Sequence, residues 1–412
     1  MLLHRPTADT TVGPRPAPAF RAGARPRPDR PPGTGRRLAM ATIGDSRDVR
    51  FWSGTPRHMA EALAAADLAV EHVGPLKAPL FGPMKAYARL RAMSGLGRPS
   101  PYHAGPVIRQ YAEDAARRIR EAAPDLVFAP AGSAFAGKVP AEVPLVYASD
   151  ATFRLVDRYH PHYRDTPEGA RRLMERLERD AIGRADLLLY PSAWAARSAV
   201  EDYGADPDRV HVVPWGANLA RPPDRELALA ERRPGPWRLL FVGVDWEKKG
   251  ADTAVDALGR LRAGGIEAEL VVCGCRPPAA FEAEGVMIVP FVDKTDPAGR
   301  ARFERLFLDA DLFVLPTRAD CYGIAFCEAA AFGVPSVAPA TGGVPGAVTD
   351  GETGVLVPDG AGGEAYADAI AAILSDPDGL ERLRRTSRDA FETRLNWNSW
   401  ARRFVELASG LP

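Results

Sequence analysis

The sequence predicts an α/β protein built from two doubly wound parallel sheets. Short apolar runs of strand length alternate with helical segments, a pattern that favours parallel strands joined by crossover helices. The alternation occurs in two sets, separated by a segment rich in proline and charge at residues 217–236. The 412 residues also exceed what one hydrophobic core usually serves, about 250 to 300 residues. We therefore expect two domains, with a ligand in the cleft that faces the carboxyl ends of the strands.

The first domain is expected at residues 38–216 and the second at residues 237–394. The first strands are predicted at Leu38–Ile43, Leu126–Ala129, Pro144–Tyr147 and Leu187–Tyr190, with a helix at Pro56–Asp67. The second set is predicted at Leu239–Val244, Glu269–Cys273, Met287–Phe291 and Leu312–Leu315, with a helix at Ile324–Phe332 and an end around Val355. A last helix is expected at residues 395–412, where Trp397 and Trp400 are spaced to share one face.

The first 37 residues differ from the rest in composition. They carry eight arginines against Asp9 and Asp29, many prolines and almost no large apolar side chain. Such a segment buries too little apolar surface to fold, so we expect a disordered basic tail. Its alternatives are an arm for anionic lipid or nucleic acid, a targeting peptide, or an overlong start ahead of Met40.

Composition is typical of a large enzyme and excludes several other classes. The 53 basic and 53 acidic residues cancel, so the overall charge does not favour a nucleic-acid partner. The cysteines Cys273, Cys275, Cys321 and Cys327 lack metal-ligand spacing, and we interpret them as reduced core thiols of a cytoplasmic protein. No apolar run approaches the roughly 20 residues needed to cross a bilayer, so we expect no membrane span.

The most informative segment is the corner between the strand at 312–315 and the helix at 324–332. Asp320 lies in the connecting loop and Glu328 on the first turns of the helix. The amides of Tyr322, Gly323 and Ile324 are expected at the helix N-terminus, where free donors and the helix dipole favour an anion such as a diphosphate. A carboxylate can accept hydrogen bonds from the hydroxyls of a ribose or a sugar. The alternative is that Asp320 caps the helix and Glu328 is solvated.

Three segments follow this corner: Gly333–Ala338, Thr341–Pro345 and Asp350–Val357. Their order resembles glycosyltransferase family 4, of the GT-B class, whose members have two Rossmann-like domains. The resemblance implies that Glu328 binds the nucleotide ribose, that Asp320 binds the donor sugar, and that Gly342 and Gly343 close the pocket. The first carboxylate is usually Glu in the family and is Asp here. The resemblance also implies that the helix at 395–412 crosses back to the first domain.

A second segment, Leu239–Gly250, supports the same resemblance. Lys249 matches the family's donor-phosphate lysine, and a fixed cation there would stabilise the charge on the departing diphosphate. Gly243 lies near the end of the predicted strand, and many members carry arginine at the next position, where this chain has Val244. Lys248, Arg318 or the helix N-terminus at Gly323 are the candidates to compensate, and Cys321 is a further donor-site candidate. The alternative for the lysine pair is the solvated start of a surface helix.

The first domain contributes its own candidates. Ser53, Gly54 and Thr55 precede a helix and match the family's glycine loop, although they also suit simple capping. Asp150 closes a strand where many members place a histidine that contacts the donor sugar; its alternative is a helix cap. His160 and His162 are interpreted as loop surface, without a metal. In the second domain, Phe291 and Val292 are candidate contacts of the base.

Together, these features predict a retaining glycosyltransferase that uses a nucleoside-diphosphate sugar and no cofactor or bound metal. In such enzymes a donor phosphate oxygen helps to deprotonate the incoming hydroxyl. The acceptor is a saccharide, a lipid or a small molecule. For the basic residues Lys85, Arg89, Arg91 and Arg98, the interpretations are a weak peripheral contact with lipid headgroups, a contact with a phosphorylated acceptor, or a solvated helix face. The competing functions are a GT-B nucleotide-sugar-binding protein with little or no turnover, and a GT-B nucleotide-sugar epimerase.

Overall fold

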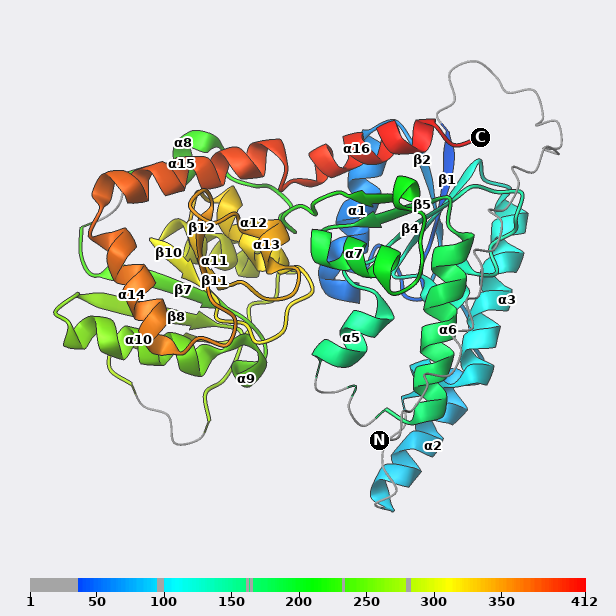
Figure 1. Ribbon diagram of the computed structural model, residues 1–412, viewed down its shortest axis with the longest axis horizontal. Helices are drawn as coiled ribbons and strands as arrows, with labels where there is room; N and C mark the ends of the chain where they lie inside the picture. Colours follow the sequence, from blue (N-terminus) through cyan, green and yellow to red (C-terminus); the bar gives the residue numbers. More distant parts are fainter. Residues whose placement is uncertain (1–35, 95–99, 161–162, 164–165, 232–233, 279–282) are drawn as a thin grey trace, which may run out of the picture. The chain divides into compact units, whose positions relative to one another are not determined.

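The computed structural model contains two six-stranded parallel sheets, which confirms the predicted fold class (Figure 1). It describes residues 36–94, 100–160, 163, 166–231, 234–278 and 283–412. We refer to the part built on strands β1 to β6 as the N-terminal domain and the part built on β7 to β12 as the C-terminal domain. The exact domain bounds predicted from the sequence stay predictions.

The N-terminal sheet has the strand order β2-β1-β3-β4-β5-β6. Its strands are β1 (Arg37–Ala41), β2 (Ala69–Val73), β3 (Leu126–Pro130), β4 (Leu145–Ala148), β5 (Leu187–Tyr190) and β6 (Val210–Val212). The helical elements between them are η1 (Phe51–Gly54), α1 (Thr55–Ala65), α2 (Phe81–Met93), η2 (Pro101–His103), α3 (Gly105–Ala122), α4 (Ser133–Ala136), α5 (Phe153–Tyr159), α6 (Glu168–Arg184), α7 (Ala193–Glu201) and η4 (Pro207–Arg209). Strands β3, β4 and β5 are buried along their whole length, as expected for central strands covered on both faces.

The C-terminal sheet has the order β12-β11-β10-β7-β8-β9. Its strands are β7 (Trp237–Val242), β8 (Ala268–Cys273), β9 (Val286–Val289), β10 (Leu312–Val314), β11 (Ser336–Pro339) and β12 (Gly354–Val357). Its helices are α9 (Trp246–Lys249), α10 (Ala251–Ala263), α11 (Pro297–Leu308), α12 (Ile324–Ala331), α13 (Val344–Ala347), α14 (Gly363–Leu374) and α15 (Pro377–Thr393). Strands β7 and β10 are neighbours, so the loops that follow them meet at one edge of the sheet.

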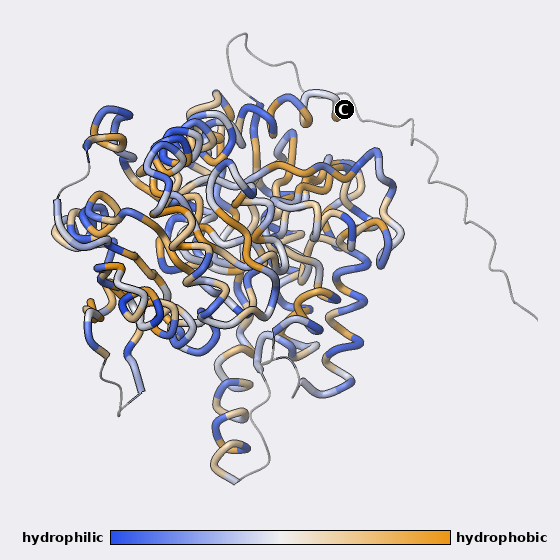
Figure 2. Tube along the Cα trace, turned by 60° about the vertical axis from the view of Figure 1, so that its left-hand side comes forward, coloured by the Kyte–Doolittle hydropathy of each residue, from blue (hydrophilic) through white to orange (hydrophobic). Residues whose placement is uncertain are grey.

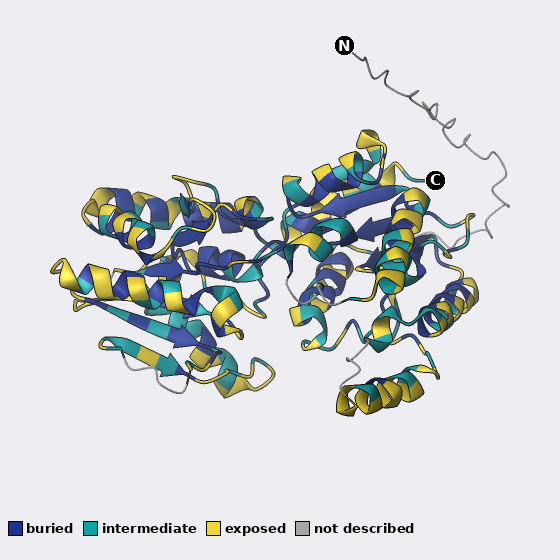
Figure 3. Cartoon of the chain, turned by 60° about the horizontal axis from the view of Figure 1, so that its bottom comes forward, coloured by how far each residue is buried: buried dark blue, intermediate teal, exposed yellow. Residues whose placement is uncertain are grey.

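Helices cover the sheets because their apolar residues recur on one side. In α3, the buried residues Val107, Tyr111, Ala115 and Ile119 follow the spacing of one helix face. Figure 3 shows the central strands as largely buried and the edge strands as partly exposed, between helices with exposed outer faces. Figure 2 likewise shows hydrophobic residues concentrated inside the chain trace and hydrophilic residues outside. None of the described helices is long and apolar enough to cross a membrane.

The connection between the sheets includes the short helix α8 (Arg225–Ala228). The chain ends in α16 (Trp397–Ser409), which packs against α1 of the N-terminal domain (Figure 1). Trp400 and Phe404 on α16 contact Phe128 of β3, with ring centroids 5.7 and 5.1 Å apart. The helix that follows α15 thus buries its aromatic face on the first domain.

Three strands are missing from the sequence prediction: Ala69–Val73, Val210–Val212 and Ser336–Pro339. The first is an edge strand interrupted by Glu71 and His72, and the second has only three residues, so neither forms a clear apolar run. The last two residues of the predicted tail are part of the described fold: Arg37 is the first residue of β1, and Arg36 donates a hydrogen bond to the Ala408 carbonyl. The rest of the tail prediction, residues 1–35, lies outside the described residues.

Helix α2 carries three of the basic residues singled out in the sequence. Lys85 and Arg89 are exposed and Arg91 is half-buried, while Arg98 lies outside the described residues. The exposed side chains of Tyr87, Leu90 and Met93 share this helix. These residues leave all three interpretations of the basic stretch open.

Candidate active site

A cavity of about 580 Å³ is lined by residues of both domains. This volume suits a ligand the size of a nucleotide or a nucleotide sugar. Most of the site residues predicted from the sequence line it: Ser53, Gly54, Thr55, Asp150, Gly243, Lys249, Phe291, Val292, Asp320, Tyr322, Gly323, Ile324 and Glu328. The strand-to-helix corners of two different domains therefore converge on one space.

Lys249 and Asp320 form an ion pair inside this cavity. The Lys249 Nζ lies 2.5 Å from Asp320 Oδ2, although the two residues are 71 positions apart. Asp245 caps α9 by accepting from the Lys248 amide, and Gly250 ends the helix with a φ of 75°. A Cβ at Gly250 would collide with the Pro316 carbonyl, so glycine lets this corner approach the segment that leads to Asp320.

The N-terminus of α12 opens into the same cavity. Gly323 is its N-cap, with a φ of 88°, and Gly323, Ile324 and Ala325 line the space. Within the described part of the chain, no side chain accepts a hydrogen bond from this helix end. Uncapped amides and the positive end of a helix dipole attract a bound anion.

Glu328 is held by a lysine that the sequence prediction missed. Its side chain is only 4% exposed, and Lys294 Nζ lies 2.9 Å from Glu328 Oε1. The Lys294 ammonium also lies 4.6 Å from the centre of the Phe303 ring. Burial of an ionised carboxylate is tolerated when a cation is paired with it. Lys294 follows the predicted strand at 287–291, and its place at a strand's carboxyl end is the signal that could have found it.

Asp150 reaches the cavity from the end of β4. Burial raises the pKa of Asp150 to about 6, and the negative charge of Asp320 adds to the shift. Lys248 acts in the opposite direction, as a nearby positive charge. Asp150 therefore titrates much closer to neutral pH than an exposed aspartate does.

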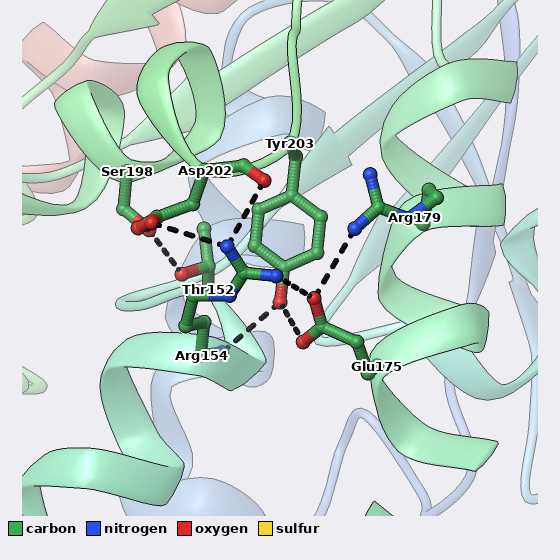
Figure 4. A network of polar contacts seen from close by, with 7 residues as sticks. All are labelled: Thr152, Arg154, Glu175, Arg179, Ser198, Asp202 and Tyr203. Atoms are coloured by element: carbon green, nitrogen blue, oxygen red, sulfur yellow. Dashed lines mark hydrogen bonds and ion pairs between the residues drawn. The ribbon is translucent and has the colours of Figure 1, made fainter. Parts of the chain in front are cut away.

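A polar network fixes the chain just after Asp150 (Figure 4). Thr152 shares a 2.6 Å hydrogen bond with Ser198, which donates to Asp202. Arg154 pairs with Asp202 at 3.3 Å and with Glu175 at 2.5 Å, and it thereby joins α5 to α6 and α7 (Figure 4). Tyr203 donates to Glu175 and accepts from the Arg154 amide. This bonding restricts the segment that carries Asp150.

The comparisons with known proteins agree with this geometry. Residues 56–221 match the model described as Glycosyltransferase Family 4, and residues 236–376 match the model described as Glycosyl transferases group 1. The chain belongs to glycosyltransferase family 4. This membership confirms the resemblance found in the sequence.

Among the relatives of this family 4 chain are D-inositol 3-phosphate glycosyltransferases. The protein of that name from Nocardia farcinica is 37% identical over 233 residues, which are 53% of this chain and 51% of the relative. The one from Corynebacterium efficiens is 31% identical over 284 residues, which are 65% of each chain. The matched region thus spans about half to two thirds of the length of these relatives.

Solved structures show the GT-B fold of this family 4 chain. Sucrose-phosphate synthase from Thermosynechococcus elongatus aligns with a TM-score of 0.64 at 18% identity, over 91% of this chain and 99% of the other. HepE from Anabaena, solved in complex with UDP and glucose, aligns with a TM-score of 0.60 at 14% identity, over 91% and 100%. At such low identities these likenesses establish the fold alone.

Some residues that the family pattern suggested lie elsewhere. Among the described residues, Arg318, Lys248 and Cys321 are not part of the cavity lining. Arg318 forms an ion pair with Asp252 at 2.5 Å and donates a hydrogen bond to the Glu247 carbonyl. Its guanidinium is therefore engaged outside the cavity lining. Lys248 precedes Lys249 by one position, and successive helical side chains point in different directions.

Cys321 is buried against the other domain instead of lining the cavity. Its sulfur lies 3.3 Å from His160 Nε2. The interpretation of His160 as loop surface is therefore wrong, because this ring is buried at the end of α5. His162 lies outside the described residues.

Gly342 and Gly343 lie behind the cavity wall. A Cβ at Gly342 would collide with the Asp320 carbonyl, and a Cβ at Gly343 would collide with the Cys321 carbonyl. Glycine at both positions lets this segment pack directly beneath the Asp320 loop. In this structure the glycine pair supports the loop and is not part of the lining.

Several cations that the sequence prediction missed also line the cavity. Arg50 and Arg57 come from the N-terminal domain, and Arg300 comes from α11. Val244, where many members have arginine, lines the cavity and is 69% exposed. Burial lowers the pKa of His58 to about 4, so this lining histidine is neutral at pH 7.

No group of three or more metal-ligating side chains was found among the described residues.

Proposed function

We propose that this protein transfers a glycosyl group from a nucleoside-diphosphate sugar to a hydroxyl acceptor, with retention of configuration and without a bound metal. The observation that carries the proposal is the convergence of Lys249, Glu328 and the uncapped N-terminus of α12 on one cavity. A cation and free amides suit a diphosphate, and a buried carboxylate beside them suits the hydroxyls of a ribose.

In this proposal the donor's parts have distinct partners. The diphosphate contacts Lys249 and the amides that follow Gly323, and the ribose hydroxyls donate to Glu328. The base lies near Phe291 and Val292; Phe291 is 68% exposed although it lines the cavity, which leaves its ring open to stack on a base. Asp320 and Asp150, whose charges influence each other, accept hydrogen bonds from the sugar.

The proposed reaction breaks the bond between the anomeric carbon and the diphosphate oxygen. The acceptor oxygen forms the new bond to that carbon on the same face, and its proton passes to an oxygen of the departing diphosphate. Negative charge therefore grows on the leaving group, where the Lys249 ammonium and the α12 amides stabilise it. These fixed charges can perform the role that a divalent metal has in other transferases, so we expect activity to persist in excess EDTA.

A phosphorylated polyol is the first acceptor to test. The relatives described above are named for D-inositol 3-phosphate. The N-terminal domain supplies Arg50 and Arg57 to the cavity, and a guanidinium is well suited to a phosphate. D-inositol 3-phosphate is therefore our first choice for an acceptor panel.

The deciding experiment incubates the purified chain with a panel of nucleotide sugars and acceptors and follows both by mass spectrometry. We expect one donor to lose its sugar, with slow hydrolysis when no acceptor is present. The Glu328→Gln variant should lose most of this turnover, whereas Glu247→Gln, which changes an exposed carboxylate on α9, should not.

The same panel separates the competing functions. Tight binding of a nucleoside diphosphate without sugar release from any donor would indicate a binding protein. An altered sugar still joined to its nucleotide would indicate an epimerase. Equal turnover by Glu328→Gln and the parent would contradict the proposed donor site.

A further inference from the structure

The loop in front of α1 has an unusual backbone conformation. Trp52, Ser53 and Gly54 have φ values of 46°, 57° and 80°, so three successive residues are left-handed. Only glycine adopts this region without a steric cost. All three residues line the cavity. Costly backbone conformations persist only where the surrounding structure holds them, and they concentrate at functional sites.

Asn218 holds this loop from the side of the interdomain connection. Its amide nitrogen donates to the Ser53 carbonyl at 2.9 Å and to Thr55 Oγ1 at 3.2 Å. Asn218 is only 5% exposed, so water competes little for these hydrogen bonds. Both amide hydrogens are therefore committed to the left-handed loop and to the first residue of α1.

Trp397, the first residue of α16, sets the orientation of that amide. Its Nε1 donates to Asn218 Oδ1 at 3.0 Å. An indole nitrogen can only donate, so the oxygen of Asn218 must face it and the NH₂ group must face the loop. The backbones are fixed beside this bond, because the Ala217 amide donates to the Leu395 carbonyl at 3.1 Å. A Cβ at Gly216 would collide with the Trp397 backbone, so the two segments pack without a gap.

We propose that Asn218 and Trp397 are positioning residues that hold the Trp52–Gly54 loop in the shape that admits the donor. Trp397 acts through Asn218, and Asn218 acts on the loop through the Ser53 carbonyl. The role in donor binding rests on the proposed function, whereas the control of loop conformation does not. The C-terminal helix α16 thereby contributes to the active site through Asn218. The structure describes no direct hydrogen bond between α16 and Ser53 or Thr55.

The chain offers a matched control for Trp397. Trp400 lies one turn along α16 and is buried against Phe128. In the described part of the chain its Nε1 has no hydrogen-bond partner. Trp397→Phe and Trp400→Phe thus each remove one buried indole N–H from the same helix, but only the first removes a bond to Asn218.

The first test measures hydrogen–deuterium exchange of peptides that cover the loop, with no ligand added. We expect Trp397→Phe to accelerate exchange at residues 52–55 by about tenfold, and Trp400→Phe to leave it near the parent value. Asn218→Asp keeps the shape of the side chain but cannot donate to the Ser53 carbonyl, so it should accelerate exchange at least as much. Equal exchange in Trp397→Phe and Trp400→Phe would overturn the proposal, even if Asn218→Asp fails to fold.

The second test is a double-mutant cycle. If Trp397 acts through Asn218, adding Trp397→Phe to Asn218→Ala should change loop exchange by less than about twofold. Independent effects that multiply in the double variant would contradict the proposed order of action.

The third measurement connects the loop to the donor. Calorimetry with UDP, GDP and ADP identifies the diphosphate that the parent binds best, and we expect Trp397→Phe to weaken that affinity about fivefold relative to Trp400→Phe. Absence of binding by the parent would count against the proposed function, while the exchange experiments would still decide the loop. Equal affinities together with altered loop exchange would show that the loop does not serve the donor, which overturns that part of the inference.

Discussion

The Lys249 ammonium lies 2.5 Å from the Asp320 carboxylate, on the wall of one cavity. The cation assigned to the diphosphate and the carboxylate assigned to the sugar thus neutralise each other. Their pairing also fixes both side chains at the point where the donor's phosphate meets its sugar in the proposed function. Fixed charges at a reacting bond stabilise a transition state more effectively than mobile ones.

Lys249→Met should lower kcat by about a hundredfold, because it removes one preorganised charge from the departing diphosphate. Steady-state transfer assays would measure the effect. Lys248→Met provides the control, since its neighbouring ammonium is not part of the cavity lining among the described residues. If Lys248→Met lost as much kcat as Lys249→Met, the effect would come from positive charge anywhere in this region, and the specific role of Lys249 would be contradicted.

Lys294→Met should weaken donor binding through Glu328. The lysine holds one carboxylate oxygen at 2.9 Å, and its removal leaves a buried charge without that partner. We expect the donor KM to rise about tenfold and the preference for ribose over 2′-deoxyribose in the bound nucleotide to shrink. Inhibition by paired ribo- and deoxyribonucleoside diphosphates would measure the preference. Arg302→Met, which changes an exposed cation on α11, should leave it intact.

Asp150 should produce a pH dependence near pH 6. Burial raises the pKa of this carboxyl to about 6, so it loses its proton as pH rises through that value. If the ionised form accepts hydrogen bonds from the sugar, kcat/KM should increase between about pH 5 and 7 and then level off. The profile of Asp150→Asn should be flat in this range. If kcat/KM of the parent did not change in this pH range, a donor contact by the ionised Asp150 carboxylate would be contradicted.

Glu178 should make the folded state less stable at high pH. This carboxyl is 3% exposed, accepts from the Tyr147 hydroxyl at 3.1 Å, and has a pKa that burial raises to about 8. The unfolded chain releases the proton near pH 4.5 while the folded protein keeps it. The contribution of Glu178 is therefore fully present below pH 4.5 and decreases as pH rises towards 8, by at most about 1.4 kcal/mol per pH unit.

Urea unfolding at pH 5, 7 and 9 would measure this contribution as a difference between variants. The Glu178→Gln side chain cannot ionise. The free energy of unfolding of this variant should therefore increase relative to that of the parent as pH rises. Glu168→Gln changes an exposed carboxylate on the same helix and should follow the parent. A constant difference between Glu178→Gln and the parent across the three pH values would contradict the assigned titration.

Local sequence patterns carried most of the fold prediction. The strand at Leu187–Tyr190 has the predicted ends, and the predicted strand at Leu312–Leu315 differs from the observed one by a single residue. Both are continuous apolar runs of strand length, which need no tertiary information to recognise. The edge strand Ala69–Val73 was missed because only Val73 is buried and Glu71 and His72 interrupt its apolar residues.

The sequence identified candidate residues that line the cavity where they share one corner, and it missed pairs of residues that meet across the fold. Asp320, Gly323 and Glu328 belong to one strand–loop–helix unit, so their spacing alone indicates that they converge. Lys294 reaches Glu328 from 34 positions away, and Trp397 reaches Asn218 from 179 positions away. No local pattern encodes such pairs, because they depend on how separate elements pack.

Local sequence patterns were sufficient to predict the two parallel sheets, the helix N-terminus at Gly323 and the charged residues around it. These depend on hydrophobic period, glycine and residue chemistry, which act over a few neighbouring positions. Other features became visible only in the folded chain: Lys249 faces Asp320 while Arg318 turns towards Asp252, and α16 reaches the Ser53 loop through Asn218. The direction of a side chain and its distant partners follow from the packing of whole elements, which is a property of the complete fold.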